Sequence, residues 1–379
     1  MVLFAVIYLD YNATTPCAPE VVEAMLPYFT QKFGNAGSVT HAMGWTAQEA
    51  VKNARANIAD HLQCEAEEIY FTSGATESCN LAIQGIYNLY NIKGREIICC
   101  TTEHKAVLDT YHFLEQQGAI VRHIGVDEAG HIDLEALEQA ITDNTILLSI
   151  MFANNETGVI HDIRSIGELA RKKGVLFFCD ATQAVGKLPV SLSELPIDAM
   201  AFSGHKLYGP KGIGGLFLRR KKPRVSLQPL FYGGGQERNR RSGTLNVPGI
   251  VGMSKAFSLF PDNQAAIAAL RDRLEAALLA IRPGFMVNGD TRQRLPHVTN
   301  IAFCGVKAEK LLSRVNHELC FSLGSACTAA QQGPSHVLQS MFDDARRLEG
   351  SVRFSLGRYT TGSEITETIT LLRKALNNL

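Results

Sequence analysis

Short apolar runs alternate with longer amphipathic stretches between about residues 65 and 220. The runs are rich in β-branched and aromatic residues, and they are EIYFTS (68–73), EIICCTT (96–102), AIVRHIGV (119–126), TILLSIMFA (145–153), VLFFCDA (175–181) and AMAFSG (199–204). Between them, segments 77–91, 105–118 and 163–174 have the apolar spacing of helices, and the last ends at Gly174. This alternation predicts an α/β fold with a mainly parallel sheet covered by helices on both faces.

The pattern changes after about residue 250. A long helical stretch is followed by shorter strand-like and helix-like segments, which are predicted over 262–281 (helix), 297–303 (strand), 308–319 (helix), 351–356 (strand) and from Gly362 (helix). The opening run VLFAVIYL (2–9) lacks the basic start and cleavage site of a signal peptide, so it predicts a buried strand. We expect a large α/β domain over 16–258 and a small α+β domain from 1–15 plus 259–379.

Composition excludes several classes of protein. Hydrophobic residues make up 46% and charged residues 20%, and 37 basic residues balance 37 acidic ones, which favours neither nucleic acid nor an anionic membrane as a partner. No apolar run approaches the roughly 20 residues of a membrane helix. The nine cysteines include no Cys-x-x-Cys pair, which predicts reduced thiols in a cytoplasmic protein.

Two local clusters have simple interpretations. The basic run 219–224 contains Pro223 and predicts a solvated turn. His317 and Cys320 have the spacing of one helical turn, but without a second pair nearby they predict packing and no metal site.

Polar residues follow several predicted strands, where the loops of an open α/β sheet face the ligand crevice. After the first strand, Thr72-Ser73-Gly74-Ala75-Thr76-Glu77 opens a helix. Free N–H groups at such a helix start suit a phosphate, whereas Ser73 or Thr76 can equally act as a plain N-cap. After the next strand, His104 can stack on a ring, carry a proton or cap a helix.

Two further strand ends carry charged residues. Asp180 ends a strongly apolar strand, where a carboxylate needs a partner, either a protonated heterocyclic nitrogen or the start of the next helix. Lys206 lies among Gly, Ser and Pro, so its desolvated amine can form a Schiff base with a carbonyl group. A phosphate site, a stacking histidine, a buried carboxylate and a lysine amine are together what pyridoxal 5'-phosphate requires.

The motifs that carry these residues resemble those of the NifS/IscS-type cysteine desulfurases, in the class V aminotransferase family. They are LDYNATTP (9–16), SGATESCNLAI (73–83), TEHKAVL (102–108), NNETG (154–158), DATQAVGK (180–187), SGHKLYGPKGIGGL (203–216), RSGTLN (241–246), GSACT (324–328) and RFSLGR (353–358), in the family's order over almost the whole chain. The resemblance implies the fold-type I architecture of pyridoxal-phosphate enzymes, with residues 16–258 as the cofactor-binding domain. It also implies a homodimer with its sites at the subunit interface.

The same resemblance implies a role for each site residue. Lys206 would bind the cofactor as a Schiff base, Asp180 would pair with its pyridinium nitrogen, and His104 would stack on its ring. Gln183 would hydrogen-bond the ring hydroxyl. The other cofactor contacts would come from Ala75, Thr76, Asn155, Ser203, Gly204, His205 and, toward the neighbouring subunit, Thr244. The substrate carboxylate would be clamped by Arg353, with Asn155 and Asn35 nearby.

The implied reaction converts L-cysteine to L-alanine. Lys206, released as an amine, would carry protons between carbon atoms, and the Cys327 thiolate would attack the substrate sulfur, leaving a persulfide on Cys327. Cys327 lies in SLGSACTAAQQG (322–333), among small and polar residues that are typical of reactive thiols and offer no aliphatic packing. The sulfur would pass to an acceptor such as an iron–sulfur scaffold protein.

Several positions depart from the family's usual pattern. Leu323 stands where many relatives have serine, and Ala329-Ala330 replace a more polar pair. The segment GNAGSVTH lacks the proline that commonly follows its asparagine, Asn35. The sequence stops at Leu379, whereas housekeeping relatives carry a further tail that helps to dock the scaffold, so the identity of the acceptor stays open.

Two other functions share part of this pattern. A different pyridoxal-phosphate enzyme, such as a selenocysteine lyase or an aminotransferase, shares Lys206 and Asp180 but does not need Cys327 for sulfur removal. A sulfur carrier uses Cys327 to accept a persulfide and binds no cofactor. A visible absorption band separates the enzymes from the carrier.

Overall fold

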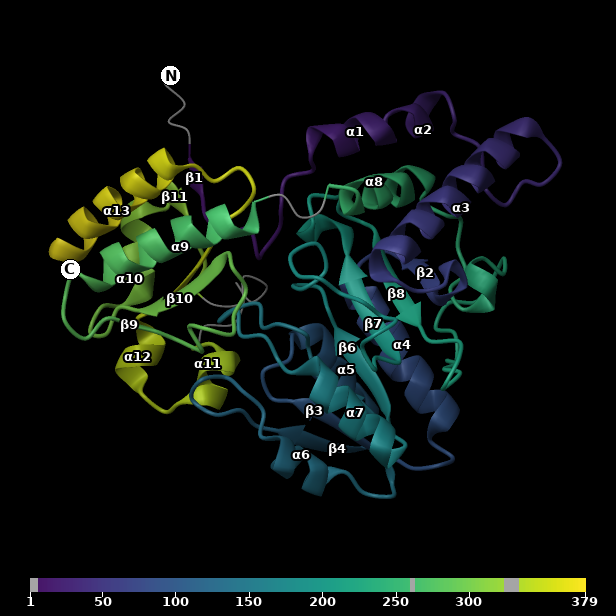
Figure 1. Cartoon of the computed structure of the whole chain (residues 1–379), viewed down its shortest axis with the longest axis horizontal. Helices are drawn as coiled ribbons and strands as arrows, with labels where there is room; N and C mark the ends of the chain where they lie inside the picture. Colours follow the sequence, from purple (N-terminus) through teal and green to yellow (C-terminus); the bar gives the residue numbers. More distant parts are fainter. Residues whose placement is uncertain (1–5, 260–262, 324–333) are drawn as a thin grey trace.

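The computed structural model describes residues 6–259, 263–323 and 334–379. Figure 1 shows a larger lobe built around a long twisted sheet and a smaller lobe that contains the C-terminus. The chain passes between the lobes more than once, because strand β1 belongs to the smaller lobe while the helices that follow it belong to the larger.

Seven strands of the described chain form the sheet of the larger lobe. Their order is β2 (Ile69–Thr72), β8 (Gly214–Leu218), β7 (Ala199–Ser203), β6 (Leu176–Asp180), β5 (Thr145–Ser149), β3 (Glu96–Cys100) and β4 (Ile120–Ile124). Neighbouring strands are parallel except at β8, which is antiparallel to β2 and β7. The predicted mainly parallel α/β fold is confirmed. The apolar pattern does not predict β8, because its paired glycines are more typical of loops.

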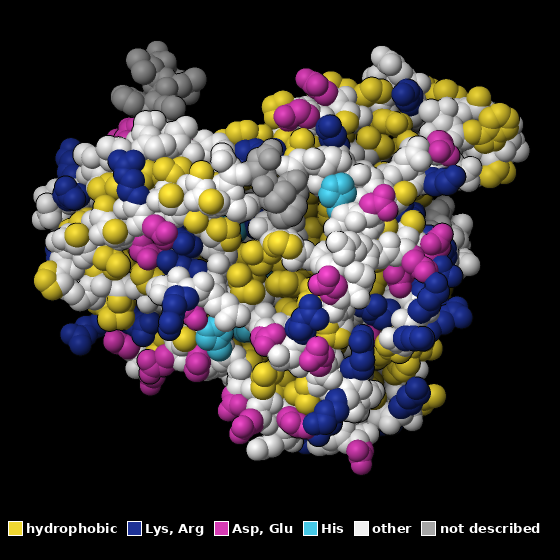
Figure 2. All heavy atoms as spheres, in the orientation of Figure 1, with side chains coloured by type: hydrophobic (Ala, Val, Ile, Leu, Met, Phe, Trp, Pro, Cys, Tyr) yellow, Lys and Arg dark blue, Asp and Glu magenta, His cyan; other side chains and the backbone are white. Residues whose placement is uncertain are grey.

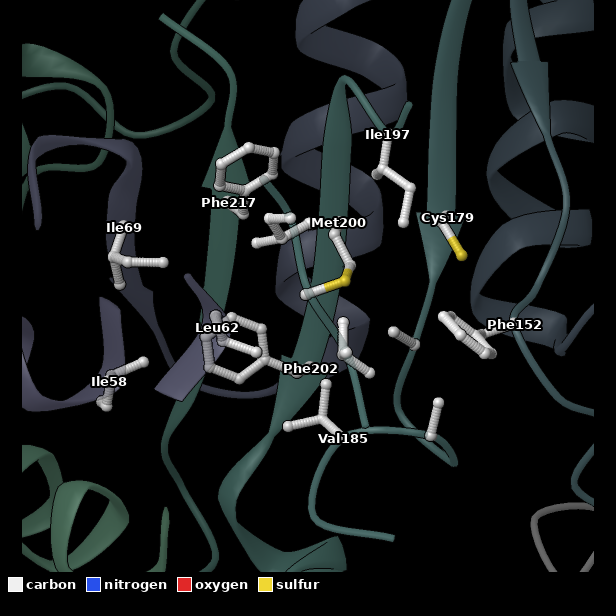
Figure 3. Packing of buried hydrophobic residues seen from close by; sticks show 14 of the residues in the cluster. Ile58, Leu62, Ile69, Phe152, Cys179, Val185, Ile197, Met200, Phe202 and Phe217 are labelled. Atoms are coloured by element: carbon white, nitrogen blue, oxygen red, sulfur yellow. The ribbon is translucent and has the colours of Figure 1, made fainter. Parts of the chain in front are cut away.

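Alternate strand residues face opposite sides of the sheet, as the two-residue repeat of a strand requires. In β3, Ile97 and Cys99 pack in one hydrophobic cluster, and Ile98 and Cys100 pack in the other. The first cluster is covered by α4 (Ala75–Tyr90) and α5 (Lys105–Gln116), and the second by α3 (Ala42–Leu62), α7 (Ile163–Lys173) and α8 (Val247–Phe257). Figure 3 shows part of the second cluster, where Ile58 and Leu62 approach the strand residues. Burial on both faces explains why the strands are continuous apolar runs.

The helices of the larger lobe agree with the predicted helical stretches. Helices α4, α5 and α7 lie within one to two residues of the predicted bounds. Gly174 ends α7 with φ of 72°, a left-handed conformation that glycine adopts without a Cβ clash. The remaining helical segments of this lobe are α1 (Pro19–Met25), α2 (Pro27–Thr30), α6 (Leu134–Ala140) and the short 3-10 turns η1 (Ala66–Glu68), η2 (Gly204–Lys206) and η3 (Glu237–Asn239).

The smaller lobe is a mixed α+β unit, as predicted for the chain after residue 250. Its antiparallel sheet has the order β12 (Ser351–Ser355), β10 (Val298–Ala302) and β9 (Met286–Val287), and β1 (Ile7–Tyr8) pairs in parallel with β11 (Leu319–Cys320). The helices are α9 (Gln264–Leu279), α10 (Ala308–Val315), α11 (His336–Met341), α12 (Ala345–Glu349) and α13 (Gly362–Asn377). Apolar residues of α9, α10 and α13 form one cluster with β1, β10 and β12.

Some predicted bounds are wrong. The helix predicted over 308–319 ends at Val315, because Leu319 continues the helical spacing but its main chain pairs with β1. His317 is consequently exposed and not a core residue. Of the strand predicted over 2–9, residues 6–9 are described, and Ile7–Tyr8 form β1.

The basic run after β8 is paired with acids. Arg220 lies 3.9 Å from Glu67, and Lys221 is hydrogen-bonded to Glu65. Within the described ranges, no helix has the length and apolar character needed to cross a membrane. In the same ranges, no three His, Cys, Asp or Glu side chains are grouped so as to hold a metal ion.

Candidate active site

The strand ends of the larger lobe and Arg353 of the smaller lobe enclose one cavity of about 460 Å³. Most of the predicted site residues line it, namely Ala75, Thr76, His104, Asn155, Asp180, Gln183, Ser203, His205, Lys206 and Arg353. Gly204, Asn35 and Thr244 do not line it; Gly204 is buried behind it, and the other two are exposed. Cys327 lies outside the described residues.

The start of α4 presents main-chain N–H groups to the cavity. Its N-cap is Gly74, and no side chain accepts a hydrogen bond there, so the predicted capping by Ser73 or Thr76 is wrong. Glu77 instead accepts the main-chain N–H of Ser73 at 2.8 Å and pairs with Arg241 at 2.7 Å. Burial alone would raise the pKa of Glu77, but these hydrogen bonds hold it below its usual value. The helix therefore begins with uncapped donors beside the positive end of its dipole, which suits an anion.

The opposite wall of this anion site comes from β7 and β8. Ser203 ends β7 and is almost fully buried, and His205 follows it. A Cβ on Gly214 would lie 2.6 Å from the Cα of Gly74, so only glycine lets β8 approach the start of α4 so closely. β8 therefore lies directly against the start of α4 at this end of the cavity.

Lys206 projects into the cavity from η2 and is held by the N-terminal segment. Its Nζ donates hydrogen bonds to the main-chain carbonyls of Asn12 at 2.5 Å and Ala13 at 2.7 Å. The predicted strand ends do not indicate this contact, since Asn12 and Ala13 lie far away in sequence. Asn12 is 1% exposed and also donates from Nδ2 to the carbonyl of Asn155.

Asp180 ends β6 with a 7% exposed side chain. One carboxylate oxygen accepts the main-chain N–H of Thr182 at 3.0 Å, and the thiol of Cys79 lies 3.8 Å from the other. None of the basic side chains that the structure describes forms an ion pair with it. A cationic ring nitrogen in the cavity would supply the partner that a buried carboxylate needs.

Glu103 is a buried acid that the strand-end pattern does not single out. It is 0% exposed, and Oε1 accepts the main-chain N–H of Met151 at 2.6 Å, while Oε2 has no described partner. Burial and the nearby charge of Asp180 raise the pKa of Glu103 well above its usual value. Burial therefore disfavours a second negative charge beside Asp180.

His104 has one of its three predicted roles, that of a helix cap, while stacking and proton transfer stay predictions. It is the N-cap of α5, where Nδ1 accepts the main-chain N–H of Ala106 at 3.1 Å, and its ring also lines the cavity. The hydrogen-bond pattern assigns the proton of the neutral ring to Nε2. Capping thus fixes the ring that faces the cavity.

Comparison with known proteins agrees with this geometry. A family model for the class-V aminotransferases matches residues 7–367. Cysteine desulfurase IscS of Salmonella arizonae is 48% identical over 98% of this chain and 93% of its own length, and the enzyme of the same name from Escherichia coli gives the same values. The chain belongs to the cysteine desulfurase family.

Solved structures agree with this assignment. The desulfurase superimposes on a NifS-like protein with a TM-score of 0.92 and 34% identity, over 99% of this chain and 100% of the other. The structure of SspA in complex with cysteine gives a TM-score of 0.83 and 35% identity, over 94% of this chain and 100% of the other. The fold-type I architecture that the motifs imply is thus confirmed at the level of the whole chain.

The smaller lobe contributes the arginine of the desulfurase cavity. Arg353, 2% exposed, donates from Nη2 to Asp10 at 2.6 Å and from Nη1 to the carbonyl of Asn155 at 2.9 Å. Its Nε is buried without a described partner. The guanidinium group predicted to bind the substrate carboxylate is therefore already paired in part with Asp10. Asp10 belongs to the motif LDYNATTP, but its position in the sequence does not indicate this role.

The side chains fit pyridoxal phosphate. Buried polar atoms at the cavity without a described partner include Thr182 Oγ1 and Arg353 Nε, and such atoms are rare unless a ligand or water completes them. The uncapped α4 start suits a phosphate, Asp180 suits a ring nitrogen, and Lys206 suits an aldehyde carbon. A polar anionic ligand with a basic ring satisfies all three at once.

We predict that His205 makes the cofactor-free protein acid-sensitive. Burial, followed by the charges of Lys206, Lys211 and Lys187, lowers the pKa of His205 to about 4 from an ordinary value of 6.5. The folded chain then binds fewer protons than the unfolded chain, so stability is present above about pH 6.5 and is lost as the pH falls toward 4. The melting temperature should fall less between pH 7 and 4.5 in His205→Gln than in the wild type. Equal pH dependence of the two proteins would contradict the neutral imidazole.

Proposed function

We propose that this desulfurase binds pyridoxal 5'-phosphate, converts L-cysteine to L-alanine and transfers the sulfur to Cys327 as a persulfide. The observation that carries the proposal is the meeting of Lys206, Asp180 and the uncapped start of α4 in one cavity. The structural relative SspA has been solved in complex with cysteine, which supports L-cysteine as the substrate.

Each side chain has one task toward the cofactor. Lys206 binds the aldehyde carbon, Asp180 pairs with the ring nitrogen, His104 stacks on the ring and Gln183 donates to its hydroxyl. The phosphate is held by Ala75, Thr76, Ser203, Gly204 and His205, with Asn155 beside the ring. When bound, pyridoxal phosphate supplies an electron sink for negative charge at the substrate α-carbon.

The remaining chemistry belongs to the chain. Arg353 and Asn155 orient the substrate carboxylate, with Asn35 as a further contact, and Lys206 moves the α-proton as a free amine. The thiolate of Cys327 forms an S–S bond with the substrate sulfur, and the C–S bond breaks with its electron pair left on the β-carbon. Protonation of that carbon gives L-alanine, so one thiol and L-cysteine become one persulfide and L-alanine.

The persulfide passes to an acceptor protein, for which we propose an iron–sulfur scaffold, in the cytoplasm. The eight cysteines that the structure describes are all free thiols, which supports a reducing compartment. We also propose the division into a cofactor-binding domain over 16–258 and a small domain from 1–15 plus 259–379. The pairing of β1 with β11 supports the assignment of the N-terminal residues to the small domain.

A homodimer is part of the proposal. Apolar side chains are exposed along α1, α2, the segment before α3 and the first turn of α3, with Leu26 57%, Phe29 58%, Phe33 66%, Val39 65% and Trp45 54% exposed. Figure 2 shows hydrophobic atoms gathered on this projecting part, which we call the apolar arm (residues 22–45). Thr244, exposed and outside the cavity, precedes α8, which packs against α1 and α3. A second copy packed against the arm would bury these side chains. Thr244 of one subunit would then contact the cofactor phosphate bound by the other.

We predict that charges on the arm separate the dimer. In Phe29→Glu/Phe33→Glu, two carboxylates would have to be buried at the interface, so the mass in sedimentation should fall from twice 41.4 kDa to 41.4 kDa. The control is Ile92→Glu, because Ile92 is 88% exposed in the turn after α4, away from the arm. A monomeric wild type, or a double variant that stays dimeric, would contradict this interface.

The cofactor prediction concerns Lys206. The wild type should show a visible absorption band with pyridoxal phosphate, and Lys206→Ala should lose it, because the variant lacks the amine proposed to bond to the aldehyde carbon. The control Lys211→Ala alters a neighbouring amine at the cavity edge and should keep the band. A colourless wild type would refute the enzyme and favour a sulfur carrier.

The nucleophile prediction concerns Cys327. In Cys327→Ala, the cofactor band should remain while sulfide release from L-cysteine falls by at least about 100-fold, as expected for loss of a nucleophile. Cys304→Ala is the matched control, since Cys304 is a partly exposed free thiol in the smaller lobe. Mass spectrometry of the wild type with L-cysteine should find alanine and a persulfide on Cys327 together. Alanine without the persulfide would favour another pyridoxal-phosphate reaction.

A further inference from the structure

Lys187 is a buried lysine for which the reaction has no assigned use. Lys187 is 7% exposed, and no carboxylate among the described residues forms an ion pair with its amine. Burial, together with the charges of Lys206 and Arg353, lowers the pKa of Lys187 well below its usual value. An amine buried without an anion is unfavourable, so a packing role alone explains it poorly.

The one hydrogen bond described for the Lys187 amine goes to the cavity residue Gln183. Lys187 Nζ lies 2.7 Å from Gln183 Oε1, four residues earlier in the turn that follows β6. On the other side, Gln183 Nε2 donates to the main-chain carbonyl of Asn12 at 3.1 Å. The amide is thus held at both of its polar atoms.

These two partners permit one orientation of the amide. A main-chain carbonyl only accepts hydrogen bonds, so it must face Nε2, and the amine of Lys187 then donates to Oε1. Nε2 carries two hydrogens, and Asn12 takes one of them. Gln183 also lines the cavity, so its second N–H is left for a ligand there.

We propose that Lys187 is a positioning residue, which fixes the Gln183 amide so that its remaining N–H donates to the ring hydroxyl of pyridoxal phosphate. This inference rests on the proposed function, in which the cavity binds pyridoxal phosphate. It adds Lys187 as a residue that acts without touching the cofactor. Without the Lys187 amine, Gln183 Oε1 is left buried and unpaired, and the amide turns to find another donor. The ring oxygen then loses its hydrogen bond.

The test is a double-mutant cycle on the dissociation constant of pyridoxal phosphate. Lys187→Met keeps the length of the side chain without its donor, and Gln183→Ala removes the amide. Each single variant should weaken cofactor binding by about tenfold, the loss of one hydrogen bond. The double variant should be no weaker than either single variant, because Lys187 acts only through Gln183.

The visible band gives a second, spectroscopic readout. Lys187→Met and Gln183→Ala should move the band of bound cofactor to the same new position, since both remove the same hydrogen bond to the ring oxygen. Lys187→Gln keeps an N–H donor and should restore part of the wild-type position and affinity. Lys172→Met changes an exposed lysine that pairs with Glu138, and it should leave both readouts unchanged.

The outcomes separate the role of Lys187 from the proposed function. Independent effects that multiply to about 100-fold in the double variant would overturn the positioning role. A lower melting temperature of cofactor-free Lys187→Met with unchanged affinity and band would likewise overturn it in favour of a structural role. If Lys187→Met does not fold, Lys187→Leu, which also lacks the donor, takes its place in the cycle with Gln183→Ala. A wild type that binds no pyridoxal phosphate would overturn the proposed function as well.

Discussion

The main-chain carbonyl of Asn12 joins the parts of the active site. It accepts hydrogen bonds from Lys206 at 2.5 Å and Gln183 at 3.1 Å, which come from the ends of two different strands of the large sheet. In its side chain, Oδ1 of Asn12 lies within hydrogen-bonding distance of Nε2 of His297 in the smaller lobe, at 2.7 Å. Asn12 is buried and lines the cavity, so these contacts join two strand ends and the smaller lobe through the N-terminal segment.

Burial also sets the charges around this contact. It lowers the pKa of Lys187 and His205 and raises the pKa of Glu103, so at all three groups burial disfavours the charged form. The ion pair of Arg353 with Asp10 shows the opposite case, in which a buried cation keeps a carboxylate at 2.6 Å. Burial thus disfavours charge at these groups unless an opposite charge lies beside the group, as Asp10 lies beside Arg353.

Much of the fold and part of the site follow from local patterns. The alternation of apolar runs predicts the strands because both faces of the sheet are covered, and the rule for strand ends selects Asp180, His104 and Lys206. Asn12 escapes such reasoning, because 194 residues separate it from Lys206 and 171 separate it from Gln183. Leu319 is misassigned for a related reason, since its helical spacing is overridden by pairing with β1.

The sequence by itself determined the fold class, the family and the residue types proposed to bind a phosphate, a ring nitrogen and an aldehyde. These are properties of short motifs, which carry the same side chains at the same spacing wherever the fold recurs. Tertiary structure alone decided that the start of α4 has no cap, that Asp10 pairs with the guanidinium group of Arg353, and that Gln183 lies between Asn12 and Lys187. Hydrogen-bond direction and burial depend on groups that approach from distant parts of the chain, and spacing along the chain does not contain that information.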